Sequence, residues 1–134
     1  MGRLITFHVK GEPAPQGSKT AFVRGRRAVL VETSKKLPEW RKRIEDTARR
    51  EYAGEPIDQP VKVTVNFFMP KPAKPMFDIP ATAPDLDKLC RAIGDGLEKG
   101  GVLRNDSRIA HWEARKYYAD TPEEMGAHIT ITTL

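Results

Sequence analysis

The chain has 134 residues, about the length of one domain, and 23 Lys and Arg against 18 Asp and Glu give it a formal net charge of +5. A single cysteine excludes a disulfide framework and a cysteine-based zinc site, and no two of the three histidines have a zinc-ligand spacing. No stretch approaches the ~18 apolar residues of a membrane span, and the start lacks a signal-peptide core, so we expect a soluble, intracellular protein.

The first strand is predicted over residues 3–9, where apolar and polar side chains alternate. Its buried face would carry Ile5, Phe7 and Val9. A segment rich in Gly and Pro follows. The runs TAFV (20–23) and AVLVE (28–32) then flank the basic sequence RGRR, a pattern that predicts a short hairpin.

A first helix is predicted from Leu37 to Tyr52, with Pro38 in its first turn. Its apolar stripe consists of Trp40, Ile44 and Ala48, spaced four residues apart, and basic side chains fill much of the rest.

The second part of the chain alternates between strands and one more helix. Strands are predicted over 61–67, 108–118 and 127–133, and a helix over 85–99 that ends at two glycines. A connector with five prolines, residues 70–84, precedes this helix. The expected architecture is a single α+β domain over residues 1–134, with a mixed sheet and two main helices.

Positive charge is concentrated in residues 1–53, which carry 13 Lys and Arg against 6 Asp and Glu. Residues 54–134 carry 10 against 12 and are slightly acidic. A basic half beside an acidic half favours a polyanion such as nucleic acid as the partner, held near an acidic centre. The alternative is a generic charged surface without an anionic partner.

Four aspartates surround the helix predicted over 85–99. Asp85 lies at its mouth, and Asp87 and Asp95 share one face with Arg91, because they are spaced by four residues. Asp106 lies in the turn RNDS before the next strand, and it meets Asp85 and Asp87 if that strand pairs beside the start of the helix.

Clustered aspartates without His or Cys form an all-oxygen site suited to Mg²⁺ or Mn²⁺. A divalent ion beside a basic surface can activate water and stabilise charge on a phosphodiester. Structural roles are the alternative. Asp85 suits a helix N-cap, Asp87 suits the helix dipole and Asp106 is an ordinary turn residue. For Asp95 we favour an ion pair with Arg91 or Lys99.

The run PDLDKLCRAIGDGLEKGGVLRNDSRI, residues 84–109, resembles the core motif of the RusA family of Holliday junction resolvases, particularly its phage and prophage members. In that family a D-x-D pair opens a helix that continues with a basic residue and a further Asp, and a D-D-[SE] turn follows. Here these features are Asp85-Leu86-Asp87, Asp95 and Asn105-Asp106-Ser107. The segment PQGSK near the start also fits.

The resemblance implies a RusA-like domain acting as a homodimeric, Mg²⁺-dependent endonuclease. Such an enzyme nicks two opposed strands of a four-way DNA junction in the cytoplasm of a bacterial host. By the same resemblance Asp85, Asp87 and Asp106 are the metal-binding catalytic carboxylates, and Arg91 is the basic catalytic residue. This chain departs from the family at two positions. Asn105 replaces the first Asp of the turn, and Arg91 stands where some members carry Lys. Arginine remains protonated and cannot donate a proton as lysine can.

The basic half then supplies candidates for phosphate contacts along the junction arms, namely Lys19, Arg24, Arg26, Arg27, Lys35 and Lys36. Phe77, in the connector, is expected either to wedge a base or to lie in the core or a dimer interface, and we favour the core or the interface. Two other functions stay open. One is a non-catalytic binder of branched or double-stranded nucleic acid, and the other is a nuclease indifferent to branching.

Overall fold

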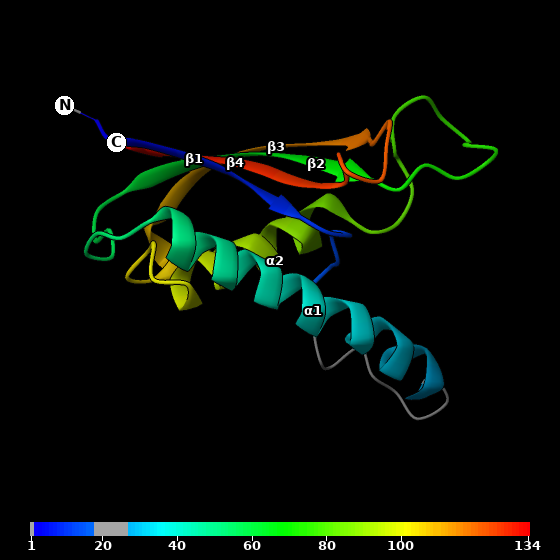
Figure 1. The fold of residues 1–134 in the computed structure, drawn as a ribbon, viewed down its shortest axis with the longest axis horizontal. Coiled ribbons are helices and arrows are strands. Elements are labelled where there is room, and N and C mark those ends of the chain that lie inside the picture. The colour runs from blue at the N-terminus through cyan, green and yellow to red at the C-terminus, as the bar shows by residue number, and fades with distance from the viewer. Residues whose placement is uncertain (1, 18–26) are drawn as a thin grey trace.

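A computed structural model describes residues 2–17 and 27–134, without the side chains of residues 27–35. The chain folds into four strands, two α-helices and one 3₁₀ turn (Figure 1). Their order is β1 (Leu4–Lys10), α1 (Arg27–Glu51), β2 (Val61–Met69), α2 (Leu86–Lys99), η3 (Asp106–Arg108), β3 (Ile109–Tyr118) and β4 (Gly126–Thr133). The α+β architecture with a mixed sheet and two helices is confirmed.

The sheet has the strand order β1-β4-β2-β3. β4 is antiparallel to both β1 and β2, whereas β2 and β3 are parallel and joined through α2. On β2 every second side chain, from Val61 to Met69, is buried, as the alternating sequence predicted. β3 therefore forms an edge of the sheet, with α2 as the crossover that leads to it.

Both helices lie on the same side of the sheet (Figure 1). The predicted stripe of Trp40, Ile44 and Ala48 is buried on α1, and Leu89, Ile93 and Leu97 are buried on α2. At Gly96 the two helices come so close that an added Cβ would lie 2.9 Å from Ile44 Cβ. α2 is thus clamped between the sheet and α1, which fixes the position of the aspartates it carries.

The hairpin prediction is wrong over residues 28–32, which belong to α1. Residues 20–23 lie outside the described part of the chain. α1 begins at Arg27 rather than Leu37, so Pro38 stands inside the helix rather than in its first turn. Apolar β-branched residues favoured a strand, but local propensity is a weak preference that the surrounding fold can override.

The connector, residues 70–84, runs irregularly between β2 and α2, as its prolines predicted. Phe77 is 49% exposed there, so it does not belong to the core, and of the two expected places only a dimer interface stays a prediction. Within the described residues, no helix is long and apolar enough to cross a membrane.

Candidate active site

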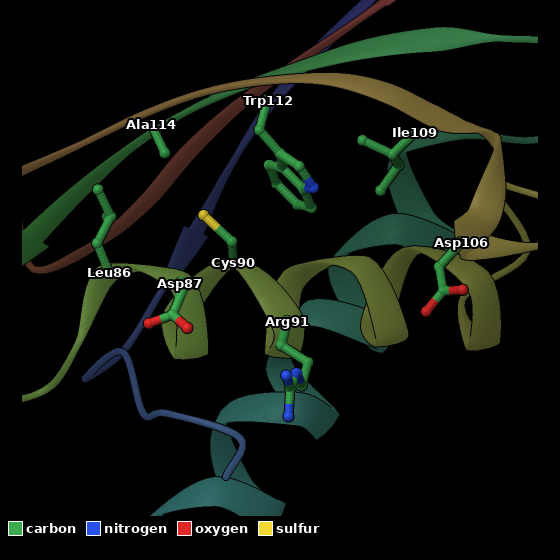
Figure 2. A pocket seen from close by; sticks show the side chains of 8 residues that line it. All are labelled: Leu86, Asp87, Cys90, Arg91, Asp106, Ile109, Trp112 and Ala114. Carbon is green, nitrogen blue, oxygen red and sulfur yellow. The ribbon is translucent and has the colours of Figure 1, made fainter. Parts of the chain in front are cut away.

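A pocket of about 740 Å³ opens between α2 and the edge strand β3 (Figure 2). It is lined by Leu86, Asp87, Cys90 and Arg91 of α2, by Asp106 of η3, and by Ile109, Trp112 and Ala114 of β3. The β2–α2–β3 crossover creates this site, because it sets the acidic start of α2 beside the strand that follows Asp106.

Asp87 and Asp106 reach the pocket from different elements, and in Figure 2 they lie on either side of Arg91. Among the described residues, Asp85, just before α2, and Asp95 form ion pairs, whereas Asp87 forms none. The Asp87 carboxylate therefore faces the pocket while the neighbouring aspartates are engaged elsewhere. Its place in the first turn also puts it near the positive end of the helix dipole.

Asp85 is the N-cap residue of α2, but its side chain forms no capping hydrogen bond. Its side chain is 61% exposed, and its Oδ2 lies 3.6 Å from Lys88 Nζ. The alternative that Asp85 serves to cap the helix through its side chain is therefore not supported. Asp85 lies at the mouth of the helix, as expected, and does not line the pocket.

Asp106 is held through its backbone. Its N–H donates to Glu98 Oε1 at 2.8 Å, and the preceding Asn105 accepts a hydrogen bond from Ser107 N at 2.8 Å. Asn105 therefore caps η3, a task that needs only a carbonyl oxygen and that asparagine performs as well as aspartate. Because these two bonds fix the turn, the Asp106 side chain remains available to the pocket.

Asp95 lies outside the pocket and forms ion pairs with Arg41 of α1 and, at 3.5 Å, with Lys99. The predicted pairing with Lys99 is confirmed. Arg91 is not the partner of Asp95, and it lines the pocket instead. Arg41 could not be found from spacing within α2, because the contact joins two helices that are distant in the sequence.

Two pocket residues had no predicted role. Cys90 is largely buried, and burial followed by the negative charge of Asp87 raises the pKa of its thiol to about 11. The thiol is therefore neutral at physiological pH and no nucleophile.

Trp112 is 36% exposed and gives the pocket an aromatic wall. The sequence marked it only as one residue of a strand.

The described residues contain no group of three or more His, Cys, Asp or Glu side chains placed to hold a metal ion. Asp106 lies beside Gly94. Gly94 follows Asp87 by seven residues, so Asp106 and Asp87 are separated by about 10 Å along the helix axis. There is thus no cage of three carboxylates from Asp85, Asp87 and Asp106. The oxygen donors fit Mg²⁺ in another way, since this ion commonly takes one or two carboxylates together with water and substrate phosphate.

The candidate phosphate contacts are mostly beyond what the structure describes. Lys19, Arg24 and Arg26 lie outside the described residues. Arg27 and Lys35 belong to α1, but their side chains are not described. Lys36 is exposed, and its Nζ lies 3.1 Å from Glu12 Oε2.

Comparison with known proteins gives one family. The family model described as Endodeoxyribonuclease RusA matches residues 10–132, nearly the whole chain, including the aspartates of α2 and η3. The search of curated proteins found no match. With a pocket that joins acidic side chains and an arginine, and a family match over almost its full length, the chain belongs to the RusA endodeoxyribonuclease family.

Proposed function

We propose that this protein is a Mg²⁺-dependent endonuclease that resolves four-way DNA junctions by paired phosphodiester hydrolysis. The observation that carries the proposal is the joint presence of Asp87, Arg91 and Asp106 in one pocket of a RusA-family chain. An acidic pocket in a chain of net charge +5 suits an anionic substrate that is held by basic groups and cut at an ion.

In this proposal Asp87 and Asp106 each offer one carboxylate, from opposite ends of the pocket, to Mg²⁺ that is otherwise held by water and phosphate oxygens, and Asp85 contributes from the rim of the site. Mn²⁺ has the same preference for oxygen donors and is the alternative ion. The bound ion supplies positive charge that stabilises the phosphodiester in the transition state. Arg91 adds charge to the phosphate without donating a proton, because guanidinium remains protonated.

The proposed assembly is a homodimer on branched DNA. A four-way junction offers two related cleavage points, and a two-fold dimer presents two identical sites to them. Lys19, Arg24, Arg26, Arg27, Lys35 and Lys36 are the proposed contacts to the arms. Each phosphate they neutralise steepens the dependence of binding on salt. The proposed place of action is the cytoplasm of a bacterial host cell, with the gene carried by a phage or prophage.

The test is cleavage of an end-labelled synthetic four-way junction with Mg²⁺ and with EDTA. Asp87→Asn and Asp106→Asn are compared with the wild type, and Asp46→Asn, on the exposed side of α1, is the matched control. We expect symmetric paired nicks that require Mg²⁺, vanish in the two site variants and persist in the control. Junction binding should survive in the site variants, because removing a negative charge lowers repulsion of phosphate.

Three outcomes would overturn the proposal. Tight junction binding without cleavage under any divalent ion indicates a binding protein. Equal cutting of junction, fork and linear duplex indicates a nuclease indifferent to branching. Unchanged cutting by Asp87→Asn places the active site elsewhere.

A further inference from the structure

Apolar side chains gather near the middle of the connector. Met76 is 75% exposed, Phe77 49% and Ile79 58%. These three make up half of the large hydrophobic side chains that remain exposed in the described part of the chain. The middle of the connector projects from the body of the protein, away from the sheet and helices (Figure 1). Three large apolar side chains exposed within four residues suit a contact with a partner.

The connector is stiffened and anchored at its base. Five prolines restrict its backbone. At the end near α2, Lys116 Nζ donates to the carbonyl oxygens of Thr82 and Pro84, both at 2.9 Å. At the other end, Ala119 N donates to Met69 O at 2.8 Å. The apolar tip is therefore attached firmly to the start of α2, where Asp87 lies.

We propose that Met76, Phe77 and Ile79, here called the tip, form a wedge that inserts between base pairs at the branch point of the DNA junction, with Phe77 stacking on a base. This inference rests on the proposed function and gives the structural basis for recognising a branch. Proteins that kink DNA insert Phe, Ile and Met side chains between base steps at the cost of unstacking. That cost is smallest where pairing is already disturbed.

The charges on the connector favour DNA over a second copy of the chain. Lys71 and Lys74 are exposed on the arm leading to the tip and form no ion pair within the described residues, whereas Asp78 is the one acidic side chain beside them. Lysines on an arm that leads to a wedge can contact phosphates next to the point of insertion. Three side chains also fall well short of the ~800 Å² per partner that a stable protein interface buries.

The experiment places 2-aminopurine at branch-point positions of a synthetic junction, because loss of stacking raises its fluorescence. The protein carries Asp87→Asn, so that the junction stays uncut. Phe77→Ala is added to this background, with Leu4→Ala, 65% exposed on β1, as the matched control. A second measurement follows junction cleavage by proteins that keep Asp87. It compares the wild type with Phe77→Ala, Phe77→Trp and Leu4→Ala.

We expect fluorescence to rise on binding, and the rise to be lost with Phe77→Ala but kept with Leu4→Ala. Junction cleavage should fall about tenfold or more in Phe77→Ala, in line with the loss of one base–aromatic stack. It should be retained in Phe77→Trp. A junction whose branch-point bases are mismatched should restore cutting by Phe77→Ala, because the wedge is then no longer needed.

Other results would overturn the wedge. Unchanged fluorescence and cleavage in Phe77→Ala would show that the tip does not enter the junction. A shift of Phe77→Ala from dimer to monomer in sedimentation would assign the tip to a second copy. Failure of the proposed function is distinguishable. If the wild type raises the fluorescence but cuts no junction, the wedge proposal stands and the proposed nuclease activity is wrong. If the protein binds no junction, both proposals are wrong.

Discussion

The Glu98 carboxylate accepts a hydrogen bond from the backbone N–H of Asp106, with 2.8 Å between Oε1 and N. The bond joins the last turn of α2 to η3. Gly94, one turn earlier on α2, packs beside Asp106 because an added Cβ would lie 3.7 Å from Asp106 Cβ. The helix that carries Asp87 thus also positions Asp106, and the two acidic side chains of the pocket share one rigid support.

Glu98→Ala should therefore loosen the turn and reduce junction cleavage by about threefold to tenfold, the expected effect of losing one charge-assisted hydrogen bond. The concentration of Mg²⁺ that gives half-maximal cleavage should rise, because Asp106 is displaced. Glu98→Gln keeps the acceptor and should restore both values. Glu123→Ala, an exposed glutamate before β4, is the control. A Glu98→Gln variant as impaired as Glu98→Ala would mean that Glu98 acts through its charge and not by positioning.

Asp95 should matter for stability and not for cutting. Asp95→Ala leaves Arg41, whose side chain is 22% exposed, without its partner across the two helices, and Arg41 Nε is already buried without a hydrogen bond among the described residues. We expect the free energy of unfolding in urea to fall by about 1–3 kcal/mol. Cleavage per folded molecule should not change.

Asp46→Ala is the matched control for Asp95, because it removes an exposed carboxylate that also has two partners, Lys42 at 3.6 Å and Arg49 at 3.4 Å. Each such surface pair contributes less than about 1 kcal/mol. A folded Asp95→Ala protein that no longer cuts DNA would contradict this assignment and return Asp95 to the active site.

Periodicity predicted the parts of the fold in which one face is buried. The alternation on β2 and the stripe on α2 both reflect burial against the core, and the observed bounds agree with the expected ones within about two residues. The start of α1 was missed because residues 28–31 are apolar and include two β-branched valines, and because Pro38 suggested the beginning of a helix rather than an interior position. In that segment local preference and the final structure disagree.

The site was predictable where spacing along one helix decides it. The motif placed Asp87 and Arg91 on a shared face, and the pocket contains both. The roles of Arg41, Glu98 and Trp112 depend on contacts between elements, which single-sequence patterns do not encode. The same holds for Asp85, whose side chain turns toward Lys88 and leaves the pocket to Asp87 and Asp106.

The packing of α1 on α2 gives a prediction with a control on the same helix. An alanine Cβ at Gly96 would lie 2.9 Å from Ile44 Cβ, so the helices must separate. Overpacking of this kind costs about 1–3 kcal/mol, more than the ~1 kcal/mol that alanine gains over glycine in a helix. At Gly94 the nearest atom, Ile109 Cδ1, would lie at an ordinary 3.5 Å.

Gly96→Ala should therefore lower the midpoint of urea unfolding, whereas Gly94→Ala should leave it equal or higher. Circular dichroism during urea titration measures both. Equal urea midpoints for the two variants would contradict the tight contact at Gly96, since backbone preference alone would then account for the effect of alanine at both positions.

A pair of histidines on the open face of the sheet should make stability depend on pH. His8 and His128 face each other across β1 and β4, with ring centroids 6.1 Å apart. Burial, and then the positive charges of His128 and Lys10, lower the pKa of His8, and Glu124 only partly opposes them. The unfolded chain therefore binds a proton at a higher pH than the folded protein does.

The sign of the effect follows from proton uptake. As pH falls below about 6.5, the ordinary pKa of histidine, the unfolded state gains a proton first, so stability decreases until pH passes the lowered pKa of folded His8. His8→Gln should lose less stability than the wild type between pH 7 and pH 5, measured by urea unfolding at each pH. His128→Gln removes one of the charges that repel a proton from His8, so its loss of stability should lie between those of the wild type and His8→Gln. Identical slopes in the wild type and His8→Gln would show that His8 does not resist protonation in the folded protein.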